Sequence, residues 1–145
     1  MQILYCESLT SIIIPNSVKT IGRFTFCGCS NLANIKIPDS VTAIEEAAFR
    51  YCNSLTSMTI PKSVSTLGHM TFDGCNNLQN ITCLASTPPE IKKKIKEGEG
   101  HSDEKEAIFS DGWKGVIYVP ANSLNLYKTA DVWNQYADLI QSIPE

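Results

Sequence analysis

The sequence has little charge and few of the residues that enzymes use most. Only 19% of its 145 residues are charged and the net charge is -3 at pH 7, so there is no broad basic field for a nucleic-acid backbone. No apolar run approaches the roughly 18 residues that a membrane-spanning helix needs. Histidine occurs twice, and a phosphate-binding glycine loop and a nucleophile elbow are both missing. These absences argue against nucleic-acid binding, membrane spanning and catalysis.

A period of 23 residues runs through the first half of the chain. The tripeptide Ile14-Pro15-Asn16 returns as Ile37-Pro38-Asp39 and as Ile60-Pro61-Lys62, each time 23 residues later. The same step links three further columns: Cys6, Cys29, Cys52 and Cys75; Leu9, Leu32, Leu55 and Leu78; Phe26, Phe49 and Phe72. So many columns in phase indicate an internal repeat.

Each repeat unit predicts one coil of a solenoid. Ile12 and Ile14 alternate as in a strand, and Pro15 ends that strand because it has no amide hydrogen to donate. Val18 and Ile21 supply a second apolar line on the returning segment, and a late phenylalanine follows. One unit cannot bury these lines alone, but stacked units fuse them into a continuous core. The prediction is a mainly β or α/β solenoid, with a parallel sheet on one face.

The cysteines fit the same pattern. A column that repeats once per coil favours buried free thiols, with disulfides between adjacent coils as the weaker alternative. Cys83 occupies a strand position and is expected in the core. Cys27 has no cysteine counterpart, because its column holds Arg50 and Asp73. It is therefore the thiol that we expect to be exposed and reactive.

The period fails after residue 83, which divides the chain into a repeat stack (1–83) and a C-terminal capping region (84–145). Residues 90–106 hold 11 of the chain's 27 charged residues. This density predicts a solvated, mobile loop with a short helix around 91–95, either without function or as a recognition loop. Residues 116–119 predict the last strand. The helical spacing of apolar residues from Leu124 to Ile140 predicts a helical cap over the end of the stack.

The unit CSNLANIKIPDSVTAIEEAAFRY resembles the Treponema-type, or BspA-like, leucine-rich repeat. The matching features are the Cys-x-x-Leu opening, the Ile-x-Ile-Pro strand end, Ser-Val, and a late Phe. The tail from residue 116 resembles the closing segment of such proteins from Bacteroides-like bacteria. The resemblance implies a secreted or surface-attached, adhesin-like protein that binds host or bacterial proteins. One departure is that the chain opens at the end of a repeat, which implies either a missing upstream region or self-association through that end.

Residues suited to catalysis or metal binding do not form a convincing set. His69 shares a column with charged residues, so we expect it to be exposed. His101-Ser102-Asp103 are adjacent and cannot converge as a catalytic triad must. Cys27-Gly28-Cys29 is not a zinc pattern. We expect no catalytic residue, metal or cofactor. A cysteine enzyme using Cys27 is the alternative.

A binding face is easier to propose. Strand alternation points the residues flanking each inward isoleucine to the open side of the sheet. They are Ser11, Ile13, Asn34, Lys36, Ser57, Thr59, Asn80 and Thr82. This strip is polar, carries one charge at Lys36 and one apolar residue at Ile13, and is either a recognition platform or an ordinary soluble face.

The predicted function is therefore a non-catalytic protein–protein interaction module, with a structural spacer or self-assembly unit of a longer repeat protein as the alternative. The first six residues lack a basic segment and an apolar stretch of signal-peptide length. The protein is thus cytoplasmic if the chain is complete, or secreted or surface-attached if its leader lies upstream. The repeat register favours the second interpretation.

Overall fold

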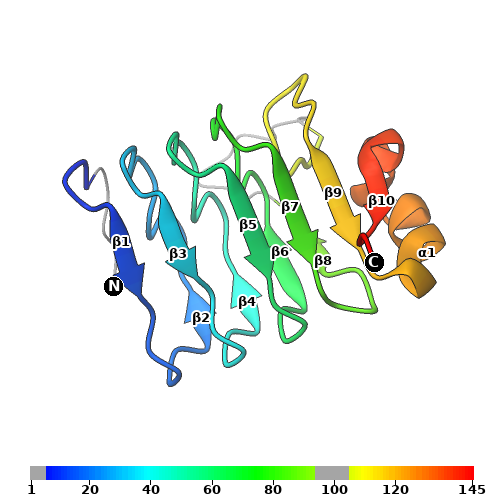
Figure 1. Cartoon of the computed structure of the whole chain (residues 1–145), viewed down its shortest axis with the longest axis horizontal. Helices are drawn as coiled ribbons and strands as arrows, with labels where there is room; N and C mark the ends of the chain where they lie inside the picture. Colours follow the sequence, from blue (N-terminus) through cyan, green and yellow to red (C-terminus); the bar gives the residue numbers. More distant parts are fainter. Residues whose placement is uncertain (1–5, 94–104) are drawn as a thin grey trace, which may run out of the picture.

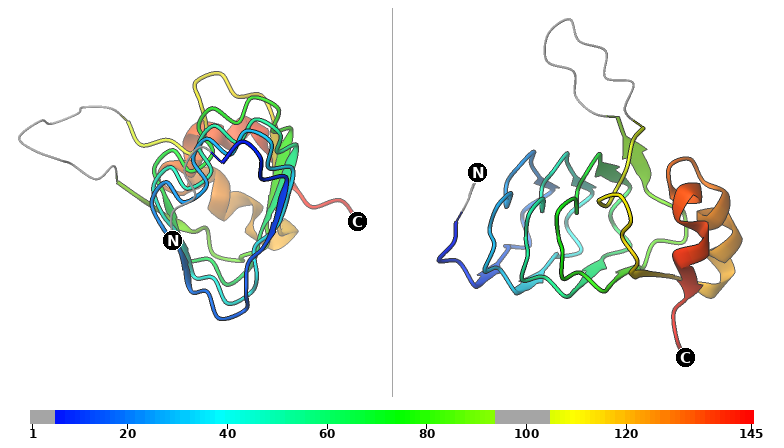
Figure 2. Two further views of the ribbon diagram at one scale, coloured as in Figure 1. Left: turned by 90° about the vertical axis from the view of Figure 1, so that its left-hand side faces the viewer. Right: turned by 90° about the horizontal axis from the view of Figure 1, so that it is seen from above.

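The computed structural model describes residues 6–93 and 105–145, which wind into successive coils along one axis (Figures 1 and 2). Each of the first four coils places one strand in each of two facing layers. The first layer contains β1 (Ser11–Ile13), β3 (Asn34–Lys36), β5 (Ser57–Ile60), β7 (Asn80–Cys83), β9 (Val116–Val119) and β10 (Ile140–Ser142). The second contains β2 (Thr20–Ile21), β4 (Ala43–Ile44), β6 (Thr66–Gly68) and β8 (Glu90–Lys92).

All strand pairs are parallel and follow the repeat. Ile12 lies opposite Ile35, and Met58 lies opposite Ile81. The second layer is one sheet, β2-β4-β6-β8, whereas the first is divided into β1-β3 and β5-β7-β9-β10. The predicted solenoid with a parallel sheet is confirmed, and the hydrogen-bonded ladder of its first layer is interrupted between β3 and β5.

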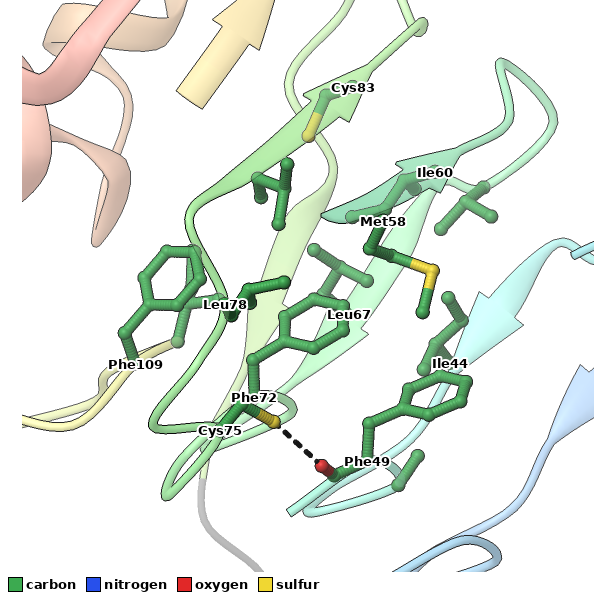
Figure 3. Close-up of a cluster of buried hydrophobic side chains, with 14 of the residues drawn as sticks. Ile44, Phe49, Met58, Ile60, Leu67, Phe72, Cys75, Leu78, Cys83 and Phe109 are labelled. Atoms are coloured by element: carbon green, nitrogen blue, oxygen red, sulfur yellow. Dashed lines mark hydrogen bonds between the residues drawn. The ribbon is translucent and has the colours of Figure 1, made fainter. Parts of the chain in front are cut away.

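The apolar columns stack in single files inside the coils. Leu32, Leu55 and Leu78 are buried. The rings of Phe26 and Phe49 are stacked at a centroid distance of 5.4 Å. Phe72 and Phe109 extend the stack at 5.7 and 6.0 Å, and Figure 3 shows Phe49, Phe72 and Phe109 in this file. Repetition of one side chain per coil therefore produces the continuous core that the period predicts.

The turn before each cysteine bonds to the next coil. The amide of Phe26 donates to the Ala48 carbonyl at 2.8 Å, and that of Phe49 donates to Thr71 at 3.0 Å. The Cys75 thiol points back and donates to the Phe49 carbonyl at 3.0 Å (Figure 3). All six cysteines are free, and all but Cys6 are buried. The thiol column thus serves as a set of small buried hydrogen-bond donors.

Raising the pH above about 9 is expected to destabilise the fold. Burial raises the pKa of the Cys75 thiol to about 12, and it also raises the pKa of Cys52 and Cys83 from their ordinary value of 9.0. Because the folded pKa is the higher one, this contribution to stability is complete below pH 9 and is lost as the pH rises toward 12. The loss is on the order of 1 kcal/mol per thiol and pH unit within this range.

Urea denaturation at pH 8 and pH 10 measures this effect. The Cys75→Ala variant is the comparison, because it removes one of the titrating groups. Its free energy of unfolding should fall less steeply with pH than that of the unmodified chain. Equal slopes in the two proteins would contradict the assignment.

Two predictions about single residues are wrong. Cys27 is buried, with 3% of its surface exposed, because its turn is bonded tightly to the next coil by Gly28, whose amide donates to Arg50. His69 is also buried, at 1%, because the segment after residue 104 returns over it and the Ala107 amide donates to its Nδ1 at 3.0 Å. The residue types in a repeat column cannot reveal the burial of either side chain, because another segment of the folded chain covers each of them.

The prediction of a short helix around residues 91–95 is also wrong for residues 91–93, which the structure describes. Residues Glu90–Lys92 form β8, which pairs with β6, and Ile91 lies opposite Leu67. The step between these two residues is 24 instead of 23, so the repeat continues past residue 83 with one extra residue. Most of the predicted charged loop, and His101, lie outside the described residues.

The tail caps the stack, but not as one helix. Ala121–Ser123 forms the 3-10 helix η1, followed by α1 (Leu124–Thr129) and by a second 3-10 helix, η2 (Trp133–Leu139). Val132 has a φ of 68°, which breaks the helix between α1 and η2. Ile140, expected in the helix, instead begins β10 and lies opposite Ile117.

Candidate binding face

The first layer brings the predicted strip together as two rows on its outer side. In-register pairing aligns Ser11 with Asn34 and Ile13 with Lys36, and further along it aligns Thr59 with Thr82. Strand alternation turns both rows away from the core. The six residues on β1, β3 and β5 are exposed, whereas Asn80 and Thr82 on β7 are half-buried. The more accessible part of the strip is therefore its β1–β5 half.

An open hollow of about 660 Å³ lies over this half and spans the break between β3 and β5. Its lining contains six of the eight predicted residues: Ser11, Ile13, Asn34, Lys36, Ser57 and Thr59. Half-buried Ile12 and Ile35 and buried Met58 also line it. Polar side chains thus surround an apolar floor.

A second hollow of about 560 Å³ lies beside it, where β1 and β3 end in their turns. The two hollows share Ile12, Ile13, Lys36 and Asp39. They form one continuous depression, with these shared residues where the two parts meet.

The depression carries one charge of each sign. Lys36 and Asp39 are both exposed, and neither has an ion-pair partner among residues 6–93 and 105–145. Some charged side chains elsewhere on the coils form ion pairs, as in Arg50–Asp73 at 2.7 Å and Arg23–Glu46 at 3.6 Å. The charged groups of Lys36 and Asp39 are therefore available to a ligand.

Three further residues of this face were missed by the sequence analysis. Tyr118 extends the row of Thr82, because β9 pairs with β7 in register. The alternation of residues 116–119 could have revealed it. Asp39 and Leu84 line the larger hollow, but they come from turns and carry no strand periodicity.

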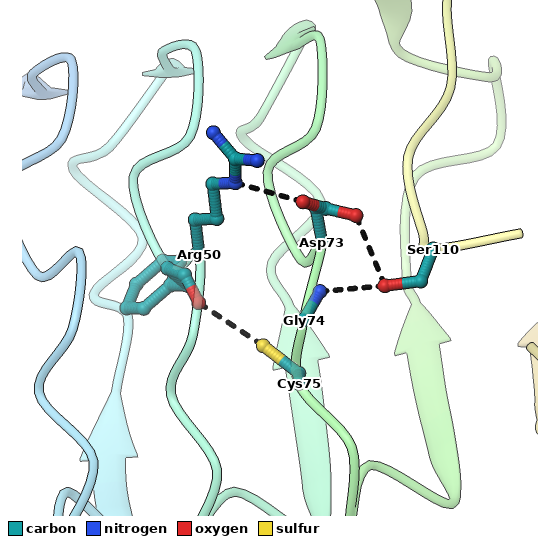
Figure 4. Close-up of polar contacts among 6 residues, drawn as sticks. Arg50, Asp73, Gly74, Cys75 and Ser110 are labelled. Carbon is teal, nitrogen blue, oxygen red and sulfur yellow. Dashed lines mark hydrogen bonds and ion pairs between the residues drawn. The ribbon is translucent and has the colours of Figure 1, made fainter.

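The polar ladder on another part of the coils has a structural role. Asp73 receives the Arg50 Nε hydrogen and the Ser110 hydroxyl at 2.7 and 2.9 Å, and the Gly74 amide donates to Ser110 at 2.7 Å (Figure 4). The Arg50 guanidinium also lies over the Tyr51 ring at 4.7 Å. Because these contacts join Arg50, Asp73 and Ser110 on three successive coils, they tie those coils together.

The described part of the chain offers little for catalysis or metal binding. Cys27 is buried, so a ligand cannot reach it without opening the turn. No three or more His, Cys, Asp and Glu side chains gather as metal ligands within residues 6–93 and 105–145. Within those residues there is also no helix with the length and apolarity to cross a bilayer.

Comparison with known protein families shows which family this chain is related to. Residues 3–96 match the model described as "BspA type Leucine rich repeat region (6 copies)". The chain belongs to the BspA-type leucine-rich repeat family. A comparison with curated proteins finds no match for this BspA-type protein.

Solved structures resemble this BspA-type protein over different shares of its length. A leucine-rich cell surface protein from Faecalibacterium prausnitzii is 39% identical over 54% of the chain, with a TM-score of 0.51. A leucine-rich repeat protein from T. pallidum is 33% identical over 62%, with a TM-score of 0.56. One from Bacteroides ovatus covers 97% at 25% identity and a TM-score of 0.60. The matches span 20%, 40% and 32% of those three chains.

Proposed function

We propose that this chain is a non-catalytic protein–protein interaction module that binds its partner on the first-layer face, over β1, β3 and β5. The observation that carries the proposal is the hollow of about 660 Å³, lined by six outward residues of three successive coils. In a solenoid, such a surface grows with each coil and suits an extended contact. The role accords with a repeat family that is typically non-catalytic.

The chemistry of the face supports a protein partner. Ile13 has 92% of its surface exposed, and hydroxyl and amide groups that can both donate and accept hydrogen bonds surround it. Protein interfaces combine apolar anchors with a polar, hydrogen-bonding rim in this way. We further propose that the module is part of a secreted or cell-surface, adhesin-like protein. In support, the relative from Faecalibacterium prausnitzii is a cell surface protein.

Lys36→Glu and Thr59→Arg are each expected to weaken partner binding about tenfold or more. The first reverses the only charge on the strip, and the second places a long cation where a small hydroxyl lines the hollow. The measurement is surface plasmon resonance against a panel of purified extracellular-matrix proteins and against intact bacterial cells.

Lys19→Glu and Thr20→Arg are the matched controls. Both residues are exposed at or beside β2, in the opposite layer, so their replacement should leave binding unchanged. Equal loss in all four variants, or no loss in the first two, would place binding elsewhere. No binding to any member of the panel would count against the module itself.

A second candidate role is that of a structural spacer or self-assembly unit. It is favoured by a hollow of about 220 Å³ in the first described coil, lined mostly by apolar residues such as Ile14, Val18 and Phe26. Another coil, from this chain or another copy, could stack there. Sedimentation of the binding samples from micromolar to millimolar concentration separates the roles, because a strict monomer excludes assembly through this coil.

A further inference from the structure

We infer that the segment bound in the depression is an extended polypeptide in which an apolar residue is flanked by a carboxylate and a cation. This inference rests on the proposed function and names the chemistry of its partner. It is built from Ile13, Lys36 and Asp39, which line both parts of the depression.

The apolar anchor and the cation are direct neighbours. Ile13 lies opposite Lys36 in the β1–β3 pair, and both side chains are exposed on the same side. Side chains opposite one another on adjacent strands have their Cβ atoms roughly 5 Å apart. A partner side chain packed on Ile13 therefore brings the next group of the partner within reach of the Lys36 ammonium, where a carboxylate fits best.

Because Asp39 lies near Lys36, a complementary partner should carry one charge of each sign. It follows Lys36 by three residues in the turn after β3, and it has no ion-pair partner in the described ranges. A partner that carried only acids would satisfy Lys36 and be repelled by Asp39. One charge of each sign, on either side of the apolar residue, matches both groups.

The rest of the depression suits a peptide backbone. Ser11 pairs in register with Asn34, Ser57 occupies the equivalent repeat position on β5, and all three line the larger hollow. Hydroxyl and amide side chains can donate to peptide carbonyls and accept from peptide amides. Two joined open hollows of about 660 and 560 Å³ also give an extended chain more room than a compact ligand needs.

The test is an NMR titration of the chain with short blocked peptides, which detects millimolar affinity. The reference probe is acetyl-Gly-Asp-Leu-Lys-Gly-amide, and three others replace Asp by Asn, Lys by Gln, or Leu by Ser. We expect the serine peptide to bind about tenfold more weakly. Each loss of a charge should weaken binding about threefold, as for exposed ion pairs.

Double-mutant cycles assign each contact to its residue. In the Lys36→Met variant, the change of Asp to Asn in the peptide should no longer lower the affinity. In the Asp39→Asn variant, the change of Lys to Gln in the peptide should no longer lower it. Lys19→Met, on the opposite side of the coils, is the matched control and should leave all four affinities unchanged. The shifted amide signals should belong to β1, β3 and the turn after β3.

Three results would overturn the inference. The first is a charge preference that is the same in Lys36→Met and in the unmodified chain. The second is binding of all four peptides on this face with equal affinity, which would leave the proposed function intact and refute the partner chemistry. The third is that no peptide shifts any signal of the first-layer face. The panel binding of Lys36→Glu and Thr59→Arg then decides the proposed function separately.

Discussion

Replacement of Phe49 by alanine is expected to lower the free energy of unfolding by about 3–5 kcal/mol. Phe49 is fully buried and its ring lies between those of Phe26 and Phe72, at 5.4 and 5.7 Å. The substitution removes the ring's buried area and both stacking contacts, and it leaves a cavity that the rigid coils on either side cannot close. Urea denaturation followed by circular dichroism measures the change.

The matched control for Phe49→Ala is Ile13→Ala. Ile13 is 92% exposed, so its truncation should change the free energy of unfolding by no more than about 0.5 kcal/mol. A loss below about 1 kcal/mol for Phe49→Ala would show that the phenylalanine column is not the packing axis of the coils.

Replacement of Trp133 by alanine is expected to cost about 3–5 kcal/mol and to loosen the end of the stack. Trp133 is fully buried, packs edge-on against Tyr127 at 5.1 Å, and donates its Nε1 hydrogen to the Pro89 carbonyl at 2.8 Å. The variant loses the packing area and leaves a buried carbonyl without that donor. Urea denaturation gives the free energy, and hydrogen exchange at Ile117 reports on the last coil.

Two comparison variants separate the causes. Trp133→Phe keeps most of the ring packing and loses the hydrogen bond, so it should cost about 1–3 kcal/mol. Leu126→Ala changes an α1 residue that is 55% exposed, and it should have little effect. If Trp133→Ala were no more destabilising than Leu126→Ala, the tail would not be a cap.

The cap works by standing in for the next coil. Within the stack, the Phe72 amide donates to the Ile108 carbonyl of the coil that follows. At the last coil the Tyr136 hydroxyl takes the place of that carbonyl and accepts the amides of Ile108 and Phe109 at 3.0 and 3.3 Å. Burial raises the pKa of Tyr136 above its ordinary value of 10.0. A side chain thus closes a backbone ladder that would otherwise end unsatisfied.

The two rows of the candidate face were predictable from sequence because they depend on local rules. A fixed period of 23 residues places Ile13 beside Lys36, and strand alternation turns both outward. The hollow itself was not predictable. It depends on the interrupted ladder between β3 and β5, and on Asp39 and Leu84, which reach it from turns.

The sequence by itself determined the solenoid, its parallel pairing and its buried columns, because stacked equivalent coils repeat the same local environment. Tertiary structure alone decided the exceptions. Ile91 rejoins a core column opposite Leu67, His69 is covered by a segment 38 residues away, and Tyr136 replaces a carbonyl. Each of these contacts joins segments that no period connects, so only the packed chain brings them together.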